Sequence, residues 1–173
     1  MRKVVIASPV QTQSGYGHHA REVISNLIEK KSKEWDIKLI SLPWGHTPFS
    51  YPISDDWKSR FISPQMQEQP DIWVQITVPN EFQKVGKFNI GVTAATEGDI
   101  CPPDWIDKIN QMNITIVPSE FTKQVILNTA QATQKSITSN IQVVPEYFDE
   151  TCYDNSKPLI ELTGIDQIEE SFA

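Results

Sequence analysis

Residues 3–42 read KVVIASPVQTQSGYGHHAREVISNLIEKKSKEWDIKLISL, and this stretch decides the fold. It opens with a short apolar run at residues 3–7 that is typical of a buried strand. After a loop with two glycines, residues 36–42 alternate as a second strand would. Between them, apolar residues recur at helical spacing and predict an amphipathic helix: Ala20, Val23, Ile24, Leu27 and Ile28. Strand, loop, helix and strand make a βαβ unit, whose parallel connection is right-handed.

The rest of the chain continues this pattern. Four more strands are predicted at residues 71–76, 88–94, 114–117 and 141–144, with helices at 103–111 and 120–130. Pro103 suits a first helical turn, and Ser119 is a good N-terminal cap for the second helix. The order predicts an α/β fold, a single Rossmann-like open parallel sheet with helices on both faces.

Two segments depart from the regular alternation. Residues 43–69 contain four prolines and two tryptophans, which predicts a long ordered excursion with one short helix near 55–61. Residues 150–173 lose periodicity and are interpreted as a C-terminal extension or interdomain linker, with a short helix near 165–170 as one option. The Rossmann-like domain is therefore predicted to span residues 1–149.

Composition limits the classes of function. The 173 residues suit one domain with an appendage. A net charge of −7 argues against nucleic acid as a partner, because binding to phosphates relies on Lys and Arg. No run approaches the roughly 18 apolar residues of a membrane span, and the run at residues 3–7 is too short for a signal peptide. Cys101 and Cys152 lack metal-type spacing and are expected to be free thiols, with a disulfide between them as the alternative. We expect a cytoplasmic protein.

The glycine loop after the first strand is the first candidate site. In open parallel sheets, ligands bind beyond the carboxyl ends of the strands, and backbone N–H groups at a helix N-terminus attract anions. Glycine costs conformational entropy, so the bend is expected to need bare backbone. A tight strand-to-helix turn without any ligand is the alternative. The candidate substrate-binding residues of this loop are Ser14, Gly15, Tyr16, Gly17 and His18.

Acidic residues follow three later elements. Glu97 and Asp99 come after the fourth strand and are the candidate catalytic residues. A carboxylate there could act as a base, hydrogen-bond a sugar hydroxyl or stabilise a developing cation; capping the next helix or simple hydration is the alternative. Ser119 and Glu120 are candidate substrate-binding residues at a helix start, although capping alone would explain them. Glu146 follows the sixth strand in the same way.

Other chemistries find little support in the sequence. His18, His19 and His46 have no Cys or carboxylate ligands at metal-site spacing, so we predict no metal and no other cofactor. The G-x-S-x-G motif of α/β-hydrolases is missing. A dinucleotide-dependent oxidoreductase is disfavoured because the second strand ends in Ile-Ser-Leu at residues 40–42, without the usual acidic residue.

Three motifs together resemble the N-terminal half of GT-B glycosyltransferases of the group-1, family-4-like type. They are SGYGHHAREVI (residues 14–24), the stretch GVTAATEGDICPPDWIDKINQMNITIVPSEFTKQV (91–125) and IQVVPEYFD (141–149). The PPDW and VPSEFTK segments, at this spacing, are the more specific part. Tyr147 departs from the family, which usually has Gly at that position. The resemblance covers about residues 1–149.

This resemblance implies a function that needs two domains. GT-B enzymes have two Rossmann-like halves; the N-terminal half mostly holds the acceptor and the C-terminal half binds the nucleotide-sugar. The implied partners are a nucleotide-sugar donor and a sugar or other hydroxyl acceptor. Nothing in this chain resembles the donor half, so the chain alone is expected to be inactive. Glu97, with Asp99 in reserve, is implied to lie near the anomeric carbon, and no metal is needed.

An alternative function is a non-catalytic module that binds a nucleotide, a sugar or a partner protein. Such a module, like an unpaired half-enzyme, should expose an apolar face where a second domain or protein docks. Both readings depend on one geometric expectation. Because parallel strands end at the same edge of a sheet, Gly15, Gly17, Glu97 and Ser119 should lie along one rim.

Overall fold

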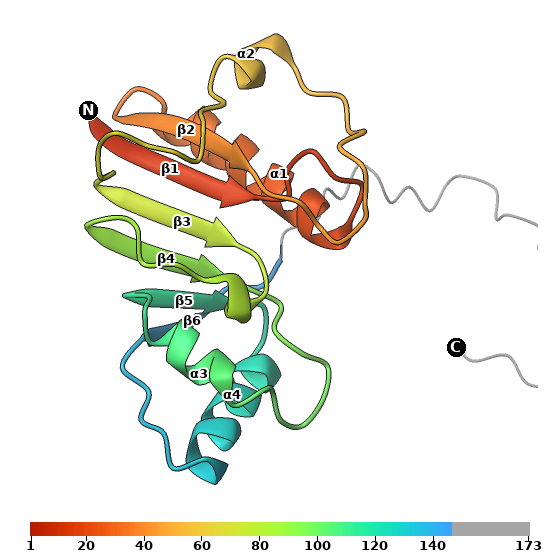
Figure 1. Ribbon diagram of the computed structural model, residues 1–173, viewed down its shortest axis with the longest axis vertical. Helices are drawn as coiled ribbons and strands as arrows, with labels where there is room; N and C mark the ends of the chain where they lie inside the picture. The colour runs from red at the N-terminus through yellow and green to blue at the C-terminus, as the bar shows by residue number, and fades with distance from the viewer. Residues whose placement is uncertain (147–173) are drawn as a thin grey trace, which may run out of the picture.

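Six strands form one all-parallel sheet in the order β2-β1-β3-β4-β5-β6 in the computed structural model, which describes residues 1–146 (Figure 1). The strands are β1 (Arg2–Ser8), β2 (Trp35–Ser41), β3 (Ile72–Ile76), β4 (Phe88–Val92), β5 (Ile114–Val117) and β6 (Asn140–Val143). The helices are α1 (Gly15–Lys31), α2 (Asp55–Lys58), the 3₁₀ turn η1 (Pro79–Glu81), α3 (Asp104–Ile109) and α4 (Glu120–Ala132).

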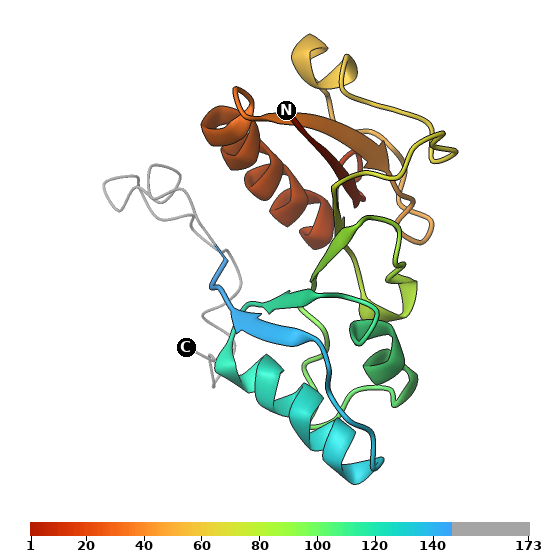
Figure 2. The same ribbon diagram turned by 90° about the vertical axis from the view of Figure 1, so that its left-hand side faces the viewer.

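The helices divide between the two faces of the sheet. Helix α1 packs over β1, β2 and β3 on one face, and α3 and α4 pack under β5 and β6 on the other (Figure 2). The predicted α/β class, a single Rossmann-like parallel sheet with helices on both faces, is confirmed. The reversal of strand order around β1 makes the carboxyl edge beside it the usual ligand-binding edge of such folds.

Each face has its own apolar core. Under α1 lies a cluster of fully buried side chains that includes Val4, Ile6, Ile24, Ile37 and Leu39. Around α3 and α4 lies a second cluster that includes Phe82, Ile106, Ile109, Val125 and Ile126. Each such side chain contributes roughly 1.5–3 kcal/mol on burial. The two clusters hold α1 and the α3–α4 pair firmly on opposite faces.

Helix α1 begins earlier than the sequence suggested, because Gly15 and Gly17 lie in its first turn rather than in a loop. Ser14 is the N-terminal cap, and its hydroxyl accepts a hydrogen bond from the Gly17 N–H at 3.0 Å. Gly17 is buried, and a Cβ there would lie 2.3 Å from the Thr12 carbonyl oxygen and 2.9 Å from that of Pro9. The bend needs bare backbone at residue 17 so that the preceding loop can fold against α1.

The long excursion after β2 is anchored to α1, which agrees with the prediction that this segment is ordered. The Arg21 guanidinium lies 3.6 Å from the centre of the Tyr51 ring and donates hydrogen bonds to the carbonyls of Val10 and Thr12. Within the excursion, α2 is shorter than predicted and ends at Lys58. Among residues 1–146, no helix is both long enough and apolar enough to cross a membrane. The helix suggested near 165–170 and the linker interpretation of 150–173 lie outside the described residues.

Candidate functional site

A pocket of about 360 Å³ opens at the carboxyl edge of the sheet, beside the first turns of α1. Its walls combine one side of α1 with the segments that follow β4 and β6. The lining residues are Gly15, Tyr16, His18, His19, Glu22, Ala94 and Glu146. We call this space the rim pocket. It is open on one side and carries two imidazoles and two carboxylates, a set suited to hydrogen-bonding a hydroxyl-rich ligand.

Tyr16 joins the start of α1 to the end of β4. Its hydroxyl lies 3.0 Å from Thr93 Oγ1 and accepts a hydrogen bond from the Ala94 N–H at 3.0 Å. Its ring packs against Trp44, with 4.4 Å between ring centroids. Burial raises the pKa of the Tyr16 phenol, because an ionised oxygen would be poorly hydrated there. Tyr16 therefore sets the distance between the two walls of the rim pocket.

Removing this hydroxyl tests its role. Tyr16→Phe should lower the free energy of unfolding by about 1 kcal/mol, the usual worth of such a hydrogen bond, as measured by urea unfolding. The raised pKa also predicts a pH effect: the neutral phenol contributes stability below the unfolded value near 10, and this is lost as pH rises through the folded pKa. In a 295 nm titration, a phenol that ionises above the ordinary range should be lost in Tyr16→Phe. An unchanged titration curve would contradict the assignment.

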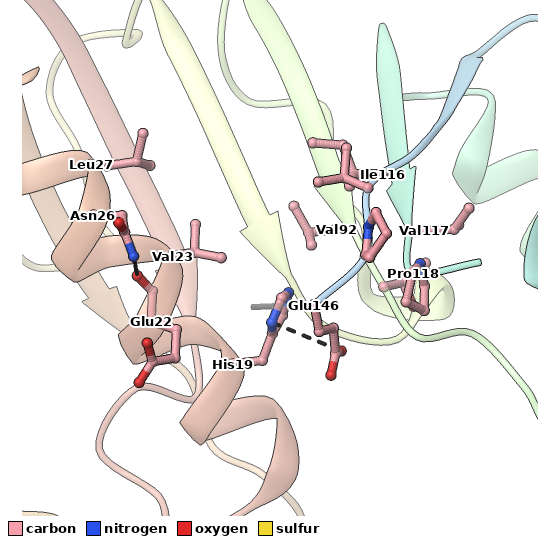
Figure 3. A pocket seen from close by; sticks show the side chains of 13 residues that line it. His19, Glu22, Val23, Asn26, Leu27, Val92, Ile116, Val117, Pro118 and Glu146 are labelled. Atoms are coloured by element: carbon pink, nitrogen blue, oxygen red, sulfur yellow. Dashed lines mark hydrogen bonds and ion pairs between the residues drawn. The ribbon is translucent and has the colours of Figure 1, made fainter. Parts of the chain in front are cut away.

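His19 and Glu146 point toward one another (Figure 3), and both line the rim pocket. His19 Nδ1 lies 3.8 Å from Glu146 Oε1, close enough for an ion pair when the imidazole is protonated. The pair links α1 to the segment after β6, two parts of the chain that are far apart in sequence. It places one imidazole and one carboxylate side by side in the wall of the pocket.

The predicted residues of the glycine loop separate into two groups. Gly15 and His18, together with Tyr16, line the rim pocket. Ser14 and Gly17 do not line it; they cap α1 and pack against the preceding loop. A Cβ on Gly15 would meet no atom within 4 Å, so the backbone there is open to a ligand.

The candidate catalytic acids lie on an exposed loop after β4. Ala95 has a φ of +55°, which turns the chain away from the strand and costs a non-glycine residue about 1 kcal/mol. Beyond this turn, the side chains of Glu97 and Asp99 are exposed, and neither lines the rim pocket. Both residues lie at the same edge of the sheet as the rim pocket, but their side chains extend into solvent.

Ser119 and Glu120 begin α4 after β5. The Ser119 hydroxyl accepts a hydrogen bond from the Thr122 N–H at 3.1 Å and lies 3.0 Å from Thr122 Oγ1, so it is a helix cap. Glu120 is exposed in the first turn. The expected alignment along one edge is present in the backbone, but of Gly15, Gly17, Glu97 and Ser119 only Gly15 lines the rim pocket.

Other lining residues were not singled out as ligand contacts from the sequence. His19 and Glu22 lie on the same side of α1 as Gly15 and His18, at i, i+3 or i+4, and i+7 spacing. That spacing was a usable signal once the helix was known to begin at Gly15. Ala94 could not be predicted from the sequence, because it lines the pocket only as a result of the position of β4 in the sheet.

In the described part of the chain, no three His, Cys, Asp or Glu side chains are grouped so that they could hold a metal ion. Cys101 is a buried free thiol, and burial raises its pKa. No protein-family model matches the chain, and a search of curated proteins found no match.

Proposed function

We propose that this chain is the acceptor-side, N-terminal half of a nucleotide-sugar-dependent GT-B glycosyltransferase of the group-1, family-4-like type, and that it acts together with a donor-binding domain. The observation that supports this best is the rim pocket itself. It is an open pocket, lined by two imidazoles and two carboxylates among apolar surface, at the carboxyl edge of an all-parallel sheet, beside the position where strand order reverses.

The rim pocket has the chemistry of a site for a hydroxylated acceptor. Glu22 and Glu146 can accept hydrogen bonds from adjacent hydroxyls, while His18 and His19 can donate or accept. The Tyr16 ring, held by Thr93 and Trp44, supplies a firm apolar wall. Such a mixture fixes the orientation of a sugar ring better than it binds a bare anion.

The exposed loop with Glu97 is where the donor would approach. In the complete enzyme, the Glu97 carboxylate would contact the transferred sugar as base, hydroxyl-binding group or cation stabiliser. A helix N-terminus and basic side chains of the donor half would neutralise the leaving diphosphate, without a metal. The openness of this loop in the described structure agrees with a site completed by a second domain.

Saturation-transfer NMR on the full chain tests the acceptor half of the proposal. Methyl hexosides should bind at millimolar concentration, whereas UDP, GDP and NADH should not. Glu22→Gln should weaken hexoside binding about tenfold, while Glu29→Gln, an exposed carboxylate further along α1, should leave it unchanged. Nucleotide binding without hexoside binding would contradict the assignment.

Complementation with a donor domain tests the catalytic part of the proposal. Sugar transfer from UDP-glucose or GDP-mannose should appear when a GT-B donor domain is added in trans. Glu97→Gln should then lower kcat by about a hundredfold or more, with hexoside binding retained. If every complemented pair stays inert while hexosides still bind, the second candidate, a non-catalytic sugar-binding module, is favoured. That candidate draws support from the open pocket alone.

A further inference from the structure

The sheet is fully covered on only one face at β4 and β5 in the part of the chain that the structure describes. Side chains of these strands that face α3 and α4 are buried, among them Asn89, Thr115 and Val117. Those on the other face are apolar: Val92 is buried in the core under α1, whereas Ile90, Ile114 and Ile116 are only partly buried, and Ile90 and Ile116 pack against the edge of that core. On β6 the outward residues Asn140 and Gln142 are polar and exposed. The partly exposed apolar strip is therefore about two strands wide.

The strip is wide enough to accommodate one more helix beside α1. All-parallel sheets are normally covered on both faces. Strands lie about 4.8 Å apart, and packed helices about 8–10 Å apart, so a helix beside α1 would sit two strands away. Helix α1 covers β1 and β3, and the next position on that face is above β4 and β5. Helices α3 and α4 cannot fill it, because they pack on the opposite face (Figure 2).

A groove of about 300 Å³ runs along this position (Figure 3). One wall is a stripe of α1 at i, i+3, i+4, i+7 and i+8 spacing, formed by His19, Glu22, Val23, Asn26 and Leu27. The opposite wall includes Val92, Ile116 and Val144. Such a stripe extends for about 12 Å, or two helical turns. The groove is lined mainly by apolar side chains and ends at the rim pocket.

The charged side chains at the end of the groove beside the rim pocket indicate which kind of partner would bind there. Glu22 and Glu146 stand where the groove meets the rim pocket and favour a cationic partner. A second copy of this chain, with a net charge of −7, is repelled. Residues 147–173 are rich in Asp and Glu, with Lys157 as their one cation, so they are also poorly matched. An amphipathic helix with Lys or Arg near one end matches both the apolar floor and the acidic end.

We propose that this groove, between α1 and the partly exposed face of β4 and β5, docks a basic amphipathic helix from another polypeptide or domain. Its apolar stripe would lie against Val23, Leu27 and Ile116, and its cations would lie near Glu22 and Glu146. This inference does not depend on sugar transfer. A half-enzyme and a non-catalytic module would both use the groove.

A designed peptide tests the groove on the full chain. The probe is a fluorescein-labelled 18-residue helix of Leu and Lys, with Leu at i, i+3, i+4 and i+7 spacing, read by fluorescence anisotropy. It should bind at least about tenfold tighter than a scrambled peptide of the same composition. Val144→Asp should weaken binding about tenfold although it adds negative charge, and it should fold normally because Val144 is 53% exposed. Leu27→Asp should also weaken peptide binding, at some cost in stability because Leu27 packs against the core under α1.

The matched control is Ser25→Asp, which adds the same charge to an exposed position of α1 outside the groove. Ser25→Asp should leave peptide affinity unchanged or slightly higher. Equal binding of patterned and scrambled peptides would overturn the proposal, as would equal behaviour of Val144→Asp and Ser25→Asp. A dimer in light scattering that Val144→Asp dissolves would assign the groove to a second copy instead. Tighter peptide binding in Ile165→Asp would assign it to the chain's own C-terminal residues.

Discussion

Gly17→Ala should unfold at a temperature about 5–10 °C below that of the parent chain, in a thermal melt followed by circular dichroism. The added methyl would lie 2.3 Å from the Thr12 carbonyl oxygen, 2.8 Å from Thr12 Oγ1 and 2.9 Å from the Pro9 carbonyl oxygen. Two of these three atoms belong to the backbone and cannot turn away. The cost is that of overpacking, about 2–3 kcal/mol.

The strain in Gly17→Ala would also reach the candidate site. Thr12 holds the loop through hydrogen bonds from its hydroxyl to the Pro9 carbonyl and with Ser14 Oγ, each at 2.8 Å. Moving Thr12 would disturb the cap of α1 and, through it, the placement of Tyr16. Hexoside binding in the NMR assay should therefore fall along with stability.

Gly15→Ala is the matched control for this prediction. A Cβ at residue 15 meets nothing within 4 Å, and alanine is a better helix former than glycine. The melting temperature should stay the same or rise by a few degrees, reflecting up to about 1 kcal/mol of recovered helix propensity. A similar destabilisation in both variants would show that glycine serves the fold at residue 17 for some reason other than close packing.

Asn89→Ala is expected to have a comparable or larger effect. Asn89 on β4 is fully buried, and its Oδ1 accepts hydrogen bonds from the N–H groups of Val85 and Gly86 at 2.9 and 2.8 Å. Its Nδ2 donates to the Gly86 carbonyl at 2.9 Å. Truncation would leave these backbone groups without partners, at about 1–3 kcal/mol for each that stays dry. We expect a loss of about 3–4 kcal/mol in urea unfolding.

The control for Asn89→Ala is Asn140→Ala on β6. Asn140 is exposed, and its Oδ1 accepts one surface hydrogen bond from Gln142 Nε2. Its removal should change stability by less than about 0.5 kcal/mol. Asn89→Asp, which keeps the acceptor oxygen and loses the donor, should fall between the two. If Asn89→Ala and Asn140→Ala lower the free energy of unfolding by the same small amount, the buried hydrogen bonds of Asn89 do not stabilise the turn before β4.

The structure gives Glu97 an exposed position on the loop after β4, outside the rim pocket. Helix capping explains Ser14 and Ser119. The polar groups that do converge are those of His18, His19, Glu22 and Glu146. Experiments on the site should therefore begin with these four side chains.

The sequence by itself determined the order of strands and helices, because that information is local. Apolar spacing along α1 follows the helical period, and Ser14 and Ser119 satisfy amide groups within three residues of themselves. The same locality explains why α1 was expected to begin late. Two glycines suggest a loop by propensity, but packing of Gly17 against Pro9 and Thr12 favours the helix.

Only the tertiary structure decided which side chains share a pocket and which face of the sheet stays partly exposed. The contact of Tyr16 with Thr93 spans 77 residues, and the approach of His19 to Glu146 joins α1 to the segment after β6. No periodicity encodes such pairs, since they depend on how strands are ordered across the sheet. The half-exposed Ile90, Ile114 and Ile116 look like ordinary core residues in the sequence. They stay partly exposed because α1 reaches only the edge of this region and α3 and α4 both pack on the opposite face.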